Sequence, residues 1–155
     1  MKPGAAAQTI DVTIAKLRLL LADVLAKEHD LTALRHQFRD QLKKAVDYSV
    51  YGDAALSGTL GLMGEIQQRI EATEATLRDL QMVRARAERE LQSLQLTKRI
   101  EAAKTELRDL LVRRDELERS GVLGAEAAEL GEQIGQLRQQ INEASEQAAK
   151  TIGQR

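Results

Sequence analysis

The chain has 155 residues, a net charge of −1 and no cysteine. A nearly neutral protein has no overall basic field that would draw it to nucleic acid or to an anionic membrane. The lack of cysteine excludes disulfides, thiol catalysis and cysteine-based metal sites, and it leaves the redox compartment open.

The composition favours an all-α fold of long helices. Aromatic residues make up 2% of the chain, Phe38 is the only phenylalanine, and Pro3 is the only proline. The strong helix formers Ala, Leu, Glu, Arg and Gln are abundant. We expect three long helices in an elongated antiparallel coiled coil, or staggered helical bundle. They should form a single domain over residues 9–155, after a flexible leader at residues 1–8.

The first helix is predicted over residues 9–50, with Thr9 or Asp11 as its capping residue. Apolar residues then alternate by three and four, which places them on one stripe of the helix. Two positions of this stripe, Glu28 and Arg35, are polar and interrupt its middle. The apolar members are Ile14, Leu17, Leu21, Val24, Leu31, Phe38, Leu42 and Ala45.

Residues 51–64 are predicted to form the turn between the first two helices, because Gly58, Gly61 and Gly64 each weaken a helix by about 1 kcal/mol relative to alanine. A turn at the end of a helical hairpin is normally polar, but this one carries no charge between residues 54 and 64. Its apolar residues could contact a partner protein, including a second copy, pack back on the bundle, or touch a membrane. The candidate interaction residues here are Tyr51, Leu56, Leu60, Leu62 and Met63.

The second helix is predicted over residues 62–119 and carries two stripes. The first comprises Ile66, Ile70, Thr73, Leu77, Leu80, Ala87, Leu91 and Leu94, and the second Leu96, Ile100, Ala103, Leu107, Leu110 and Leu117. The second stripe does not continue the heptad spacing of the first, so the apolar face moves around the helix. We therefore expect the neighbouring helix to change near residue 96. Off both stripes lie Met82, Val83, Leu111 and Val112, candidates for contact with a second copy or another protein.

Ser120 and Gly121 are predicted to end the second helix, and a third follows over residues 123–152. Gly131 and Gly135 lie beside its stripe, where another helix could approach closely. Short loops join antiparallel neighbours, so the first and third helices should lie along opposite halves of the second and overlap near its middle. The stripe comprises Leu123, Ala127, Leu130, Ile134, Leu137, Ile141, Ala144 and Ala148.

No residue pattern indicates catalysis, a cofactor or a metal. His29 and His36 are two helical turns apart, about 10 Å, which is too far to share one ion. The arginines of the second helix alternate with acidic residues at a spacing of four, as in Arg84 and Glu88, which is typical of a solvated face. The glycines lack a phosphate-loop ending, and a thin bundle offers no cleft for a catalytic carboxylate pair. We therefore expect no enzymatic activity and no small-molecule substrate.

These patterns predict a cytoplasmic, non-enzymatic coiled-coil scaffold or adaptor that mediates protein–protein assembly and forms a homo-oligomer. The N-terminus lacks the apolar segment of a signal peptide. Two alternatives stay open. One is a regulatory stalk that engages an ATPase or a secretion machine, and the other is a weak binder of nucleic acid or a membrane surface through the arginines of the second helix.

The layout of residues 20–119 is similar to that of the small coiled-coil stalk proteins of flagellar and type III secretion ATPases. The likeness consists of a helical hairpin of about this length, Tyr48 and Tyr51 before the turn, and a charged second helix. The third helix and its glycines are not part of that layout. The resemblance implies the first alternative, in which an ATPase is the partner.

Overall fold

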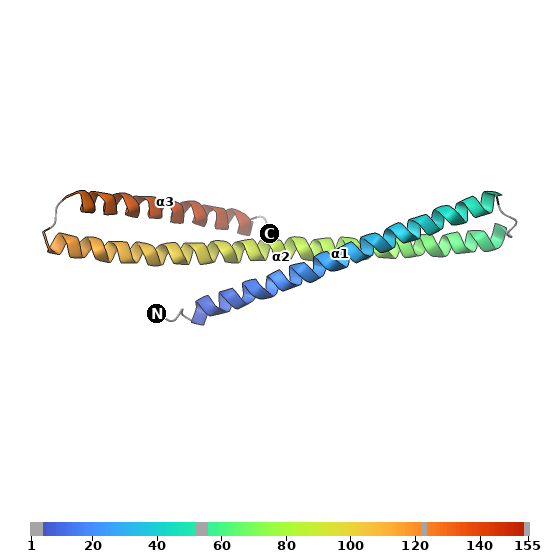
Figure 1. Cartoon of the computed structure of the whole chain (residues 1–155), viewed down its shortest axis with the longest axis horizontal. Helices are drawn as coiled ribbons and strands as arrows, with labels where there is room; N and C mark the ends of the chain where they lie inside the picture. Colours follow the sequence, from blue (N-terminus) through green and yellow to red (C-terminus); the bar gives the residue numbers. More distant parts are fainter. Residues whose placement is uncertain (1–4, 52–55, 122–123, 154–155) are drawn as a thin grey trace. The chain divides into compact units, whose positions relative to one another are not determined.

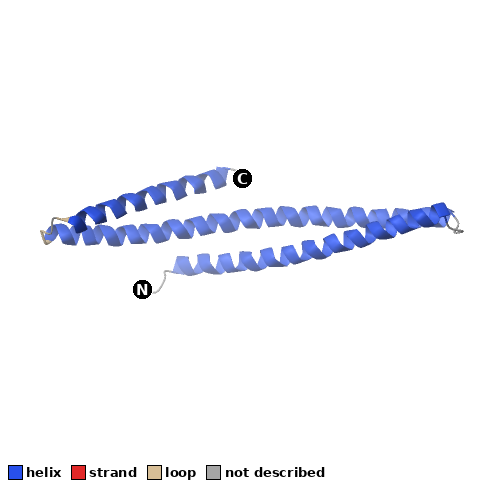
Figure 2. Cartoon of the chain, turned by 45° about the horizontal axis from the view of Figure 1, so that its top comes forward, coloured by secondary structure: helices blue, strands red, loops and turns tan. Residues whose placement is uncertain are grey.

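The structure is a computed structural model that describes residues 5–51, 56–121 and 124–153 (Figure 1). It contains α1 (Ala5–Tyr51), α2 (Leu56–Arg119) and α3 (Ala125–Gly153). Helices account for nearly all of the described residues, which include no strand (Figure 2). The prediction of an all-α protein with three long helices is confirmed.

The start of α1 differs from the predicted one. The helix begins at Ala5, inside the expected leader, so Thr9 and Asp11 lie within it and cannot cap it. The Thr9 carbonyl instead accepts a hydrogen bond of 2.9 Å from the Thr13 hydroxyl, one helical turn further on. Alanine has the highest helix propensity of all residues, and the run that starts at Ala5 therefore extends the helix backwards.

The glycine-rich segment is helical, and its predicted assignment as a turn was wrong. The second helix begins at Leu56, so Gly58, Gly61 and Gly64 all lie in its first three turns. Packing outweighs the low helix propensity of glycine here, because the segment also supplies residues that face α1. Thr59 is buried, and Met63 packs against a core cluster of Ala45, Ile66 and Ile70.

Burial follows the predicted stripes on all three helices. In the described ranges every apolar stripe residue is buried or half-buried, while most residues between them are exposed. Of the predicted stripe residues, only Leu123 lies outside the described ranges. The core residues with the least exposed surface are Ile14, Leu17, Val24, Ala45, Ile66, Ile70, Leu77, Ala87, Leu96, Leu130, Ile134, Leu137 and Ala144.

The helices group into two compact units. One consists of Leu17–Glu88, and the other of Met1–Lys16 together with Arg89–Arg155. In the Leu17–Glu88 unit, α1 and α2 run in opposite directions, because Arg39 pairs with Glu74 whereas the earlier Glu28 pairs with the later Arg84. We refer to this unit as the hairpin.

In the other unit, α2 contacts both α1 and α3. Lys98 donates a hydrogen bond of 2.6 Å to Asp11 of α1. The next residues of the second stripe, Ile100 and Ala103, form a small groove with Ile141 and Ala144 of α3. Near the middle of α2, α1 and α3 therefore both contact it, and α3 lies against Ile100 and Ala103 of the second stripe. Figure 1 shows α3 running beside the second half of α2.

The end of α2 depends on the backbone geometry of Gly121. This residue has a φ of 70°, in the left-handed region that favours glycine. Its amide donates a hydrogen bond to the Glu118 carbonyl, and the Ser120 amide donates one to Glu116. The predicted helix end at Arg119 and the stop at Gly121 are both confirmed.

Alanine substitutions at two glycines should have opposite effects on stability. Gly131 lies in the interior of α3, and a Cβ added there meets only open space, so Gly131→Ala should stabilise the protein by about 0.5–1 kcal/mol. Gly121→Ala should destabilise it by about 1 kcal/mol because of its positive φ. Urea unfolding of both variants measures the two shifts. A destabilising Gly131→Ala would mean that a helix does approach this face in solution.

Candidate functional site

The predicted interaction residues near the start of α2 divide into two groups. Leu60 and Leu62 are each about half exposed, and neither belongs to the packed stripe. Met63 faces inward and packs against the cluster that contains Ala45. The side chains of Tyr51 and Leu56 lie outside the described residues. Packing back on the bundle therefore accounts for Met63, whereas Leu60 and Leu62 are available to a partner.

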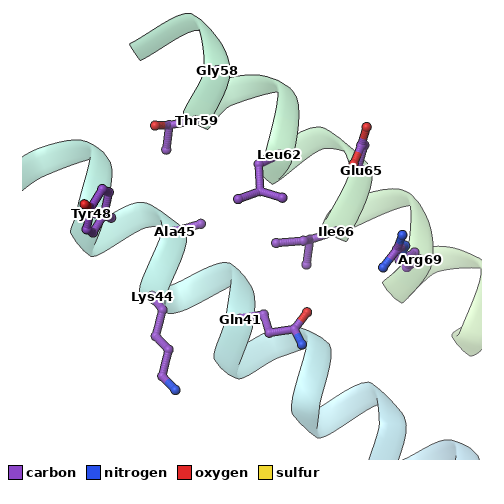
Figure 3. A pocket seen from close by; sticks show the side chains of 10 residues that line it. All are labelled: Gln41, Lys44, Ala45, Tyr48, Gly58, Thr59, Leu62, Glu65, Ile66 and Arg69. Carbon is purple, nitrogen blue, oxygen red and sulfur yellow. The ribbon is translucent and has the colours of Figure 1, made fainter. Parts of the chain in front are cut away.

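A groove of about 650 Å³ lies beside these residues, between α1 and α2 (Figure 3). Ala45, Leu62 and Ile66 point toward the space between the two helices and make its floor apolar. The remaining lining residues are Gln41, Lys44, Tyr48, Gly58, Thr59, Glu65 and Arg69. Its size and apolar floor suit one or two large apolar side chains of another protein.

Local helix geometry explains why the groove forms here. Ala45 is small, and Gly58 has no side chain, so the last turns of α1 and the first turns of α2 leave space that larger residues would fill. Lys44, Glu65 and Arg69 also line the groove and give it charges of both signs. Sequence reasoning noted Tyr48 but not the groove, because the groove depends on which positions of α1 lie opposite Gly58.

The off-stripe residues of α2 also differ in exposure. Met82 is 71% exposed, and Val83 and Val112 are exposed as well. Leu111 is half-buried, beside the stripe that α3 covers. An exposed side chain as large as Met82 has no role in the core, which leaves three of the four predicted residues open to contact with another molecule.

Ion pairs join residues of different helices as well as residues one turn apart in the same helix. Arg39 and Glu74 form an ion pair of 2.9 Å, and Lys98 and Asp11 one of 2.6 Å. The sequence predicted only pairs one turn apart, such as Arg84 with Glu88, whose atoms are 4.0 Å apart. No sequence signal identified the longer-range pairs, since they require knowledge of which residues face each other.

The described residues bear on the sequence-based candidates for a metal site and a membrane span. His29 and His36 are exposed, and within the described ranges no three His, Cys, Asp or Glu side chains gather as metal ligands. None of the helices, over their described residues, has an apolar stretch long enough to cross a membrane. The arrangement of the groove and the exposed apolar residues is suited to binding another protein surface.

No known protein family matches the chain, and no curated protein or solved structure is similar to it at a significant level.

Proposed function

We propose that the protein is a non-enzymatic coiled-coil scaffold or adaptor, which holds proteins together and associates with itself. The observation that carries this proposal is the pair Leu60 and Leu62, both large and exposed, of which Leu62 also lines the apolar groove. Large apolar side chains exposed next to an apolar groove mark interaction surfaces in proteins that are otherwise polar outside.

The thinness of the core also supports self-association. Among the described residues no large side chain is fully enclosed, because a helix in a pair buries only one stripe. Burying a Leu or Ile side chain contributes roughly 1.5–3 kcal/mol, while ordering each residue costs about 1–2 kcal/mol. A second copy would bury the exposed apolar residues and add to a core that is small for 155 residues.

Serine substitution of the exposed pair should remove association and leave the fold intact. The double variant Leu60→Ser/Leu62→Ser should be monomeric at tens of micromolar, where the unmodified protein forms dimers or larger species. Its helicity should be unchanged, because neither side chain lies in the core. Light scattering after size-exclusion chromatography gives the mass, and circular dichroism gives the helicity.

Met63→Ser is the matched control, because Met63 is a neighbour that packs inward. It should lower the free energy of unfolding by about 1–3 kcal/mol, since the core loses an apolar side chain. The unmodified protein is expected to form dimers or larger species at tens of micromolar. If it stays monomeric even at 100 micromolar, self-association is contradicted.

A further inference from the structure

α1 carries a second stripe on the face that points away from its packed stripe. Leu19 lies two residues from both Leu17 and Leu21 of the packed stripe, which places it on the opposite side of the helix. Its side chain is 72% exposed. Positions three and four residues apart continue this outward stripe in both directions, and all of them are exposed. The members are Val12, Ala15, Leu19, Ala22, Ala26, His29, Ala33 and His36.

The outward stripe of α1 differs from an ordinary solvated face because it holds no Lys, Arg, Asp or Glu. The outward side of a surface helix normally carries charged residues. The corresponding stripe of α2 follows this rule, since it contains Arg78 and Arg89 on either side of Met82. In a chain of which 30% is charged, an uncharged outward stripe with exposed Leu and Val side chains is typical of a face that another surface covers.

The two sides of α1 also carry exposed apolar residues, but charges interrupt them. On one side, Lys27 lies seven residues from both Leu20 and Leu34. On the other side, Arg39 lies seven residues before Val46. Residues seven apart share one face of such a helix, so each of these rows contains a charge. The outward stripe is the uninterrupted one of the three, which makes it the surface best suited to a contact along the helix.

The charged residues that border the outward stripe complement those of a second copy. In two parallel helices in register, the residue just before a seam position faces the residue five positions later on the other helix. Arg18 then faces Asp23 of the other copy, and Asp11 faces Lys16. Both pairs are attractive, and each occurs twice because the arrangement is symmetric.

An antiparallel pairing of the same stripes fits less well. It brings together residues on the same side of the stripe, so Lys16 faces Asp23 of the other copy, whereas Arg18 faces Leu25. One kind of attractive pair then forms instead of two. The charges therefore favour the parallel direction.

All four bordering residues are accessible to a second copy. Lys16 and Arg18 are exposed and form no ion pair with any residue that the structure describes. Asp23 and Asp11 each pair with a lysine of the same chain, at 3.0 and 2.6 Å, but their side chains are 59% and 52% exposed. A carboxylate has two oxygens and accepts several hydrogen bonds, so each can also contact a cation of another copy.

We propose that a second copy of the chain docks on the outward stripe of α1, with the two α1 helices parallel and in register about a two-fold axis. Leu19 then packs against Leu19 of the other copy. This inference rests on the proposed self-association and adds a second surface to the one at Leu60 and Leu62, which belong to α2. Alanine buries little apolar area, so the contact along α1 should be the weaker one. It should act mainly between chains that the other surface has already brought together.

The double variant Leu60→Ser/Leu62→Ser is the background that isolates the contact along α1. We expect it to be monomeric at tens of micromolar and to dimerise at hundreds of micromolar, as measured by sedimentation equilibrium. Adding Leu19→Asp should abolish this dimer, because it places two carboxylates against each other in the contact. Helicity should be unchanged, since the side chain is exposed. Met82→Asp is the matched control: Met82 is 71% exposed on the outward stripe of α2, and its substitution should leave dimerisation unchanged.

Charge reversal in the same background tests the direction of the helices. Arg18→Glu should weaken dimerisation about tenfold, because two attractive pairs become repulsive. Adding Asp23→Arg should restore it, because the reversed pairs attract again. Arg78→Glu is the control, since it makes the same change of charge on the outward stripe of α2 and should leave dimerisation unchanged.

The outcomes separate this contact from the proposed function. If the background variant stays monomeric at hundreds of micromolar while the unmodified chain associates, the contact along α1 is overturned and self-association through Leu60 and Leu62 stands. Equal effects of Leu19→Asp and Met82→Asp would also overturn it. No effect of Arg18→Glu, or no restoration by Asp23→Arg, would overturn the parallel arrangement. An unmodified chain that is monomeric at the same concentrations would overturn both the contact and the proposed self-association.

Discussion

Replacing Ile134 with alanine should release α3 from α2 while residues 17–88 stay folded. Ile134 is 3% exposed, at the centre of the stripe that also contains Leu130 and Leu137. Removing most of a buried Ile side chain costs about 2–5 kcal/mol. This is a large share of the stabilisation that a single helix of 29 residues gains by packing against one neighbouring helix. Because α3 belongs to a separate compact unit, the loss should stay local.

Hydrogen exchange resolved along the chain measures this effect. Amides of α3 should lose most of their protection in Ile134→Ala, while those of the hairpin should exchange as in the unmodified protein. Ile152→Ala is the control, because it makes the same chemical change in the same helix at a residue that is 59% exposed. Equal loss of protection in α3 and in the hairpin would show that the two units unfold as one.

Removing the charge of Arg84 should destabilise the hairpin more than removing that of Glu28. Their ion pair, 2.9 Å long, lies within the packed stripes, where the Glu28 side chain is 12% exposed and that of Arg84 is 35% exposed. The second carboxylate oxygen of Glu28, Oε1, is buried and has no hydrogen-bond partner. Arg84→Met keeps the apolar stem but leaves a largely buried carboxylate without its partner, at a cost of about 2–3 kcal/mol.

Glu28→Gln should cost less, about 1 kcal/mol, because Arg84 can turn toward water and the amide oxygen can still accept its hydrogen bond. The double variant Glu28→Leu/Arg84→Leu should be at least as stable as the unmodified protein, since well-packed apolar residues avoid the desolvation of both charges. Urea unfolding of the variants provides the free energies.

Lys27→Ala is the control for this series, because it removes an exposed ion pair of 3.0 Å with Asp23 and should change stability by only a few tenths of a kcal/mol. If Arg84→Met proves no more damaging than Lys27→Ala, the Glu28–Arg84 pair contributes nothing beyond a surface contact.

One polar position in the stripe of α1 and one in that of α2 have a structural reason that the sequence alone does not show. Glu28 interrupts the stripe of α1, and Arg84 stands between Leu80 and Ala87 in that of α2. Folding places the two opposite each other, so each supplies the partner that the other needs. A single buried polar pair of this kind favours one register of two helices over the alternatives, since a shift would bury each charge against apolar residues.

The sequence by itself determined the three helices, their stripes and the change of face near Leu96. Helical periodicity is a local property: an apolar residue every three or four positions defines a buried face whichever helix covers it. The stop at Gly121 was equally local, because a positive φ depends on the residue type at that position.

Tertiary structure decided what depends on residues far apart in the chain. The start of α2 at Leu56, despite three glycines, reflects packing of Thr59 and Met63 toward α1, which outweighs local propensity. The groove beside Ala45 and the ion pair of Arg39 with Glu74 likewise exist only in one register of the two helices. Heptads specify which face of a helix is buried, but many partners and registers can cover the same stripe, and only their packing in three dimensions selects one.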